Sequence, residues 1–125
     1  MDYEQFCGGT VQRQAAKLNQ HWSIEPVELA RRLKEGEPIH LLDVRDPIER
    51  QISELPGAEF VSIQLLDDWI GKHEQDETIV VICRTGSRSG RAVKKLRKAG
   101  FQNALNLSGG LNAWARDVDQ NMLQY

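Results

Sequence analysis

The residues best suited to chemistry lie in one short stretch around Cys83. A β-branched run, residues 79–82, ends at this cysteine, and the residues after it are small or cationic until apolar residues recur at helical spacing. This order predicts a buried strand, a tight loop that begins with the thiol, and a helix. Such a loop directs its backbone N–H groups and the positive end of the helix at one point, where they hold an anion and favour a thiolate.

The residues beside the thiol decide between two interpretations of it. A cysteine at the end of a hydrophobic strand is most often a small buried apolar residue. Here Arg84, Arg88 and Arg91 fall in the same segment. Three guanidinium groups near one thiol favour an anion pocket over core packing, so we predict that Cys83 is reactive. Cys7 stands beside a flexible Gly-Gly pair and is interpreted as an unremarkable thiol.

Three cysteine chemistries can be compared with this loop. Papain-type acyl transfer needs a histidine base, and none of the three histidines stands in a local motif for that role. Phosphate-ester cleavage by a cysteine phosphatase needs an arginine six positions after the nucleophile. Here the arginine is Arg88, five positions on, and Ser89 takes the sixth, so the loop is one residue short. Sulfur transfer needs only a thiolate, and amides and cations that stabilise a persulfide anion.

Composition limits the other functions that the chain can have. Its 125 residues suffice for one domain, and a net charge of −2 gives no general attraction to nucleic acid or membrane. No apolar run approaches the ~20 residues that span a bilayer, and residues 1–5 are acidic, unlike a signal peptide. Two cysteines make neither a disulfide framework nor, alone, a four-ligand zinc site. We expect a cytoplasmic protein without a metal or a nucleic-acid or membrane partner.

The elements that must position the loop alternate along the chain. Residues 1–22 are expected to be an extension, and residues 23–125 the domain. The alternation of strands and helices predicts an α/β fold with a largely parallel sheet, in which ligands bind at the carboxyl ends of strands. Helices are expected over 26–36, 48–52, 65–71, 87–99 and 111–115, and strands over 39–44, 60–63, 79–82 and 104–107.

Four motifs in this order resemble those of a rhodanese domain, over residues 23 to 116. They are Leu42-Asp43-Val44-Arg45, Pro56-Gly57-Ala58, Cys83-Arg84-Thr85-Gly86-Ser87-Arg88-Ser89 and Leu107-Ser108-Gly109-Gly110-Leu111-Asn112-Ala113-Trp114. The resemblance implies the rhodanese-like α/β fold, with a central, mainly parallel five-stranded sheet flanked by helices on both faces.

One departure from the family pattern indicates a subgroup. Residues 53–55 read Ser-Glu-Leu where rhodanese domains usually have Gly-His-Ile. This variation is similar to that of rhodanese domains fused behind an adenylating domain of the molybdopterin-synthase sulfurylase type. Residues 2–8 resemble the segment that follows the zinc site in those adenylating enzymes, and residues 113–119 with the final Gln124-Tyr125 resemble the end of such fusions. The resemblance implies a stand-alone relative or an excised piece, with a place in molybdopterin or thiamine biosynthesis.

The resemblance also implies a thiosulfate sulfurtransferase-like activity and its site. Cys83 takes sulfane sulfur from thiosulfate, or from the persulfide of a cysteine desulfurase, and passes it to cyanide or to a ubiquitin-like sulfur carrier. This persulfide chemistry needs no metal and no organic cofactor. The substrate-binding residues are Arg84, Thr85, Gly86, Ser87 and Arg88. Asp43, Arg45 and Glu49 are interpreted as an ion-pair set that braces the loop.

Two alternatives stay open. One is a non-catalytic rhodanese-like module that regulates or binds other proteins, with a loop cysteine that only senses oxidants. The other is an arsenate reductase or phosphatase on the related fold.

Overall fold

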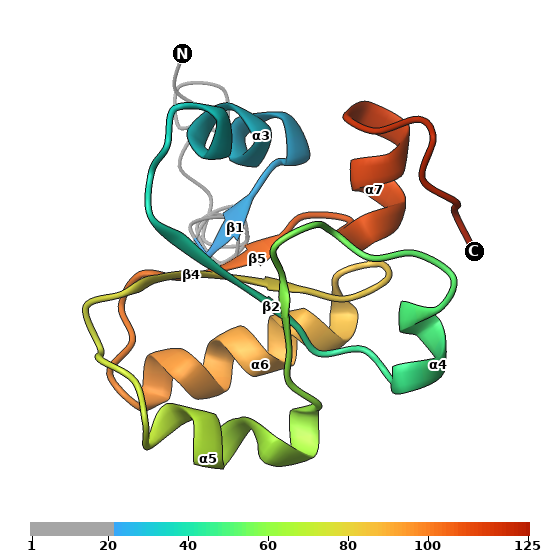
Figure 1. Cartoon of the computed structure of the whole chain (residues 1–125). Coiled ribbons are helices and arrows are strands. Elements are labelled where there is room, and N and C mark those ends of the chain that lie inside the picture. The colour runs from blue at the N-terminus through green and yellow to red at the C-terminus, as the bar shows by residue number, and fades with distance from the viewer. Residues whose placement is uncertain (1–21) are drawn as a thin grey trace, which may run out of the picture.

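A computed structural model describes residues 22–125 of the chain (Figure 1). Five strands form one sheet in the order β1-β5-β4-β2-β3, and every adjacent pair runs parallel. The strands are β1 (Ser23–Ile24), β2 (Ile39–Asp43), β3 (Glu59–Phe60), β4 (Thr78–Ile82) and β5 (Ala104–Leu107). The helices are α3 (Pro26–Lys34), α4 (Pro47–Arg50), the 3-10 helix η1 (Ile63–Leu65), α5 (Leu66–Ile70), α6 (Ser87–Lys98) and α7 (Gly110–Asp117). The predicted fold class is confirmed.

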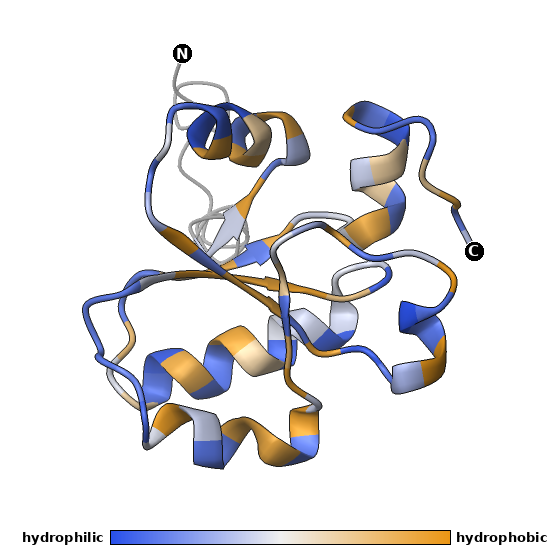
Figure 2. Ribbon diagram, in the orientation of Figure 1, coloured by the Kyte–Doolittle hydropathy of each residue, from blue (hydrophilic) through white to orange (hydrophobic). Residues whose placement is uncertain are grey.

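Two hydrophobic cores lie on opposite faces of the sheet. Figure 1 shows α3 and α7 on one face and α5 and α6 on the other. Successive side chains of a strand point to opposite faces, so in β4 Ile79 and Val81 join the core under α6, while Val80 and Ile82 join the core under α3 and α7. The side chain of Cys83, the next residue after β4, belongs to the same core as Ile79 and Val81. The central strand β4 is hydrophobic and fully buried from Ile79 to Ile82, as a parallel sheet covered on both faces requires (Figure 2).

The structure corrects some of the predicted boundaries. Strand β1 was not expected, since two residues are too few to show a period; it pairs with β5 through Ser23 and Ile24. The strand expected over residues 60–63 is only Glu59–Phe60. Helix α7 begins at Gly110, one residue early, and continues to Asp117. The predicted extension lies outside the described residues up to residue 21, as does Cys7.

Trp22 begins the described part of the chain and contacts the sheet and α6. Its carbonyl accepts the backbone N–H of Asn106 at 2.6 Å, and the guanidinium of Arg97 lies over its ring at 5.1 Å. Within residues 22–125 the helices are all too short or too polar to cross a membrane.

Candidate active site

Cys83 is the first residue after β4, at the carboxyl end of the sheet, and its side chain is fully buried. The backbone N–H of Gly86 donates to its Sγ at 3.1 Å, and that of Ser89 donates at 3.3 Å. Gly86 has φ +103°, a left-handed conformation that lets the loop turn its amides inward. The predicted strand, loop and helix therefore surround the sulfur with main-chain donors.

The surroundings of Cys83 lower the pKa of its thiol. Burial, the largest single effect, raises the pKa because it disfavours the charged sulfur. The opposing hydrogen bonds come from the Ser89 hydroxyl and from the amides of Ser89, Gly86 and Thr85, and together they outweigh burial. Hydrogen bonds, more than the arginines and the helix end expected from the sequence, thus lower the pKa of the thiol.

The Ser89 hydroxyl belongs to the site, although we did not assign it a role from the sequence. Its Oγ lies 3.2 Å from Cys83 Sγ, and it donates to Asn106 Oδ1 at 2.5 Å. Asn106 in turn donates from Nδ2 to the carbonyl of Gly86 at 3.0 Å. Ser89 takes the sixth position after the cysteine, so its spacing was visible in the sequence. The contribution of Asn106 on β5, 17 residues further along the chain, depends on the fold.

The Ser89→Ala substitution is expected to raise the pKa of Cys83, because the thiolate loses its hydroxyl donor. A hydrogen bond to a charged group contributes about 1.5–3 kcal/mol, so the ionisation constant of the thiol is expected to fall roughly ten- to a hundredfold, and alkylation near neutral pH to slow. The measurement is ultraviolet thiolate absorbance against pH, in a Cys7→Ser background that leaves one titrating thiol. Ser87→Ala, at an exposed position of the same loop, is the control. An unchanged titration midpoint in Ser89→Ala contradicts the assigned role.

The three arginines of the loop segment occupy different places. Arg88 forms a two-point ion pair with Glu49, at 2.6 and 2.8 Å, and this pair raises the pKa of the guanidinium. Arg84 is exposed, and its guanidinium lies 5.1 Å from the ring centroid of Tyr125. Arg91 is exposed and lines a hollow beside α6 together with Trp22. Arg88 is held beside the loop by its ion pair, whereas a place for Arg91 beside the thiol stays a prediction.

The supporting residues predicted from the sequence form one connected network. The carboxylate of Asp43 accepts a hydrogen bond from Arg45 Nη2 at 2.7 Å, and both side chains are almost completely buried. Arg45 also donates to the Tyr125 hydroxyl at 3.0 Å, and that hydroxyl donates to Glu49 Oε1 at 2.7 Å. Glu49 then holds Arg88. The network thus runs from β2 to the first turn of α6, next to Cys83. Tyr125 was missed because it lies 76 residues from Glu49.

Glu49 is expected to make the fold sensitive to acid. The Arg88 guanidinium is the largest cause that lowers the pKa of this carboxyl from 4.5 to about 2. Because the folded-state pKa is the lower one, the carboxylate stabilises the fold above about pH 4.5 and this stabilisation is lost as the pH falls toward 2. When unfolding by urea is measured from about pH 6 to about pH 3, the free energy of unfolding should fall less steeply for Glu49→Gln than for the parent. Glu25→Gln, at an exposed position, should keep the parent's slope.

The start of α7 packs directly against the cysteine loop. The backbone N–H of Leu111 donates to the carbonyl of Cys83 at 2.8 Å, and that of Asn112 donates to the carbonyl of Arg84 at 3.1 Å. Gly110, with φ +67°, leaves no room for a side chain, because a Cβ there would overlap the Arg84 carbonyl. The close approach of two backbones thus requires a glycine at position 110.

Comparison with known proteins shows the family of this chain. The sequence model described as "Rhodanese-like domain" matches residues 25–117. The probable adenylyltransferase/sulfurtransferase MoeZ of Mycobacterium tuberculosis is 40% identical over 127 residues, which covers 100% of this chain and 32% of that protein. A sulfurtransferase of Allochromatium vinosum is 34% identical over 93 residues, covering 74% of this chain and 87% of that protein. The chain spans about a third of the length of MoeZ and of the plant and animal adenylyltransferase and sulfurtransferase relatives.

Solved structures give the same result. The rhodanese-like domain protein from Staphylococcus aureus superposes with a TM-score of 0.68 at 30% identity, covering 74% of this chain and 89% of that one. The rhodanese-like domain of the Anabaena Alr3790 protein has a TM-score of 0.69 at 32% identity, covering 76% and 74%. Human single-domain sulfurtransferase TSTD1, with a TM-score of 0.71 at 23% identity, shares the fold. With its family model over most of the described residues and its cysteine loop at the carboxyl end of a parallel sheet, the chain belongs to the rhodanese-like domain family.

Proposed function

We propose that this chain is a sulfurtransferase that carries sulfane sulfur as a persulfide on Cys83. The observation that carries the proposal is the set of hydrogen bonds that converge on Sγ from the amides of Gly86 and Ser89 and from the Ser89 hydroxyl. These donors stabilise negative charge on sulfur and need no metal or organic cofactor. The names of the relatives support the same chemistry, since MoeZ and the Allochromatium protein are both described as sulfurtransferases.

In the first step the Cys83 thiolate attacks the outer sulfur of thiosulfate. A bond forms between Sγ and that sulfur, the sulfur–sulfur bond of the donor breaks, and sulfite leaves with the electron pair. The product is a persulfide anion, and the loop amides from residues 84 to 88 are the donors available to hold it. Arg88, beside the loop, and Arg84, exposed on it, supply positive charge for the donor's oxygens.

In the second step a thiophilic acceptor attacks the outer sulfur of the persulfide. Cyanide takes this atom as thiocyanate and returns the Cys83 thiolate. For the cell we propose a protein persulfide, such as that of a cysteine desulfurase, as donor and the activated end of a ubiquitin-like sulfur carrier as acceptor. With this acceptor the outer sulfur of the persulfide is the nucleophile: it bonds to the acyl carbon of the adenylated end, and adenylate leaves with the electron pair. A second thiol then attacks Sγ of the resulting acyl disulfide, and the carrier leaves as a thiocarboxylate. Fusion of adenylyltransferase and sulfurtransferase in relatives such as MoeZ supports a carrier activated by adenylation.

Burial sets a condition on both steps. Cys83 is 0% exposed, whereas Arg84, Thr85 and Ser87 above it are exposed. A donor therefore reaches Sγ only when the residues that cover it move aside. We assign this activity to residues 23–125, treat residues 1–22 as an extension, and propose the reducing cytoplasm as its compartment because a free thiolate persists there.

Intact-mass measurement after incubation with thiosulfate tests the proposal. The full chain should gain the mass of one sulfur atom and lose it again on addition of cyanide, with thiocyanate as product. Cys83→Ser should give no adduct, and Cys7→Ser should behave as the parent. An unmodified parent would leave a binding or regulatory module as the better account, while cleavage of an aryl phosphate that depends on Cys83 would favour a phosphatase.

A further inference from the structure

Two imidazoles and a carboxylate come together toward the amino ends of β2 and β4. They are His40 on β2, Glu59 on β3 and His73 in the segment between α5 and β4, and one ligand atom of each lies within 4.8 Å of the other two. His40 pairs with Ile79 across the sheet, and Cys83 lies four residues further along, roughly 13 Å at the rise of a strand. We propose that His40, Glu59 and His73 form a binding site for a divalent transition-metal ion, separate from the sulfur chemistry.

The donor set determines the class of ion. Two imidazole nitrogens and one carboxylate oxygen suit Zn²⁺ and ions of similar softness, with water in the remaining position. His40 Nε2 and Glu59 Oε1 lie 2.7 Å apart, as a direct hydrogen bond. Zn²⁺, with bonds of about 2.0–2.2 Å, fits between these two atoms after they separate slightly. His73 supplies the third ligand atom.

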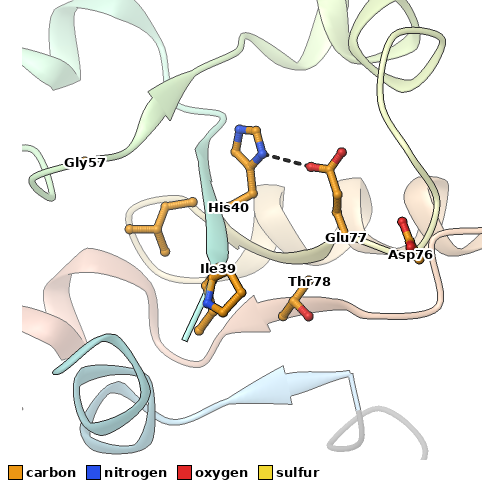
Figure 3. A pocket seen from close by; sticks show the side chains of 8 residues that line it. Ile39, His40, Gly57, Asp76, Glu77 and Thr78 are labelled. Atoms are coloured by element: carbon orange, nitrogen blue, oxygen red, sulfur yellow. Dashed lines mark hydrogen bonds and ion pairs between the residues drawn. The ribbon is translucent and has the colours of Figure 1, made fainter. Parts of the chain in front are cut away.

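Both histidines already have the partners that metal ligands require. A metal-binding histidine usually donates its second ring nitrogen to a carboxylate or a carbonyl, which fixes the ring and its tautomer. His40 Nδ1 lies 3.1 Å from Glu77 Oε1, and Figure 3 shows the other ring nitrogen on the side away from Glu77. His73 Nδ1 lies 2.8 Å from the carbonyl of Trp69. In both rings Nε2 is the nitrogen left to bind an ion.

The neighbouring aromatic ring holds the third ligand in place. The imidazole of His73 stacks on Trp69 with ring centroids 3.7 Å apart and an interplanar angle of 10°. The indole Nε1 of Trp69 donates to Glu59 Oε1 at 3.3 Å, so one tryptophan orients two of the three ligands. Such fixed side chains lose little freedom when an ion binds.

Charge also favours a cation at this position. The two ring nitrogens of His40 face two carboxylates, Glu59 and Glu77. A cation on Nε2 lies between that nitrogen and the Glu59 carboxylate, where its charge is favourable. A hollow of about 520 Å³ at this end of the sheet is lined by His40 and its partner Glu77, among others (Figure 3).

Calorimetric titration with Zn²⁺ tests the site in the full chain. The background carries Cys7→Ser and Cys83→Ser, so that no thiolate binds the ion. We expect one Zn²⁺ per chain. Glu59→Gln and His73→Phe, which keeps a ring stacked on Trp69, should each weaken binding by at least about tenfold, and Glu77→Gln by about ten- to a hundredfold, because outer-shell partners have effects of this size. His21→Phe, the third histidine of the sequence, is the matched control and should bind as the background does.

Thermal unfolding gives a second measurement. An ion that binds only the folded chain raises Tm with its concentration, and a chelator reverses the rise. Saturable binding that survives both Glu59→Gln and His73→Phe, or no binding by the background chain with Zn²⁺ in excess, overturns the proposal. Sulfur acceptance by the parent chain should be the same with and without chelator, so the ion site and the proposed sulfur transfer can fail separately.

Discussion

Replacing Gly110 with alanine is expected to destabilise the fold by several kcal/mol and to displace the cysteine loop. The φ of +67° at this position costs an alanine about 1–3 kcal/mol. The new Cβ also overlaps the carbonyl of Arg84, a backbone group that cannot rotate away, which adds about 1–3 kcal/mol. Because Arg84 follows Cys83 directly, sulfur acceptance by the folded fraction should fall roughly a hundredfold, as for a catalytic group misplaced by about 1 Å.

Gly57→Ala is the matched control for this substitution. Gly57 has a similar φ of +86°, but nothing lies within 4 Å of the Cβ that would be added. This variant should lose only about 1–2 kcal/mol in urea unfolding and accept sulfur from thiosulfate at the parent's rate. If the two variants are equally stable and equally active, the close approach of α7 to the cysteine loop contributes to neither stability nor sulfur acceptance.

Replacing Arg45 with methionine is expected to cost about 3–5 kcal/mol, the usual result of leaving a buried charge without its partner. Arg45 is fully buried and Asp43 is 2% exposed. Without the guanidinium, the Asp43 carboxylate keeps the backbone N–H of residue 45, at 3.0 Å, and loses its counter-charge. The carbonyls of Glu49 and Ser53 lose a donor as well.

The double substitution Asp43→Leu with Arg45→Met distinguishes the contribution of the ion pair from that of side-chain packing. Removing both charges should restore much of the stability lost in the single variant, since apolar residues of similar size often replace a buried ion pair well. Arg116→Met, which removes an exposed arginine paired with Asp117, should have little effect on the urea midpoint. A double variant no more stable than Arg45→Met would show that the loss comes from packing.

The local part of the site could be predicted from the sequence. The β-branched run before Cys83, the small residues after it and the apolar spacing of α6 all lie within 20 residues, where strand and helix periods are visible. The alternation of elements likewise predicted the parallel sheet. The bracing of the loop by Asp43, Arg45 and Glu49 was expected as ion pairs, but their actual partners were not.

The distant part could not be predicted, because no local pattern encodes it. Tyr125 joins Arg45 to Glu49, and Asn106 holds Ser89, only after β2, β5 and the last residues have packed together. The same is true of His40, Glu59 and His73, which are separated by 19 and 14 residues. Strand β1 was missed because its two residues gain their strand character from pairing with β5.

The position of Ser89 between two acceptors has a consequence for how the sulfur changes charge. A hydroxyl has one hydrogen, yet Ser89 Oγ lies within bonding distance of both Cys83 Sγ and Asn106 Oδ1. While the sulfur is a thiol, that hydrogen can stay on the asparagine and the S–H can point at Oγ; once the sulfur is negative, the hydrogen has to swing toward it. Ionisation of the sulfur at the end of β4 therefore changes the direction of one O–H that also contacts Asn106 on β5.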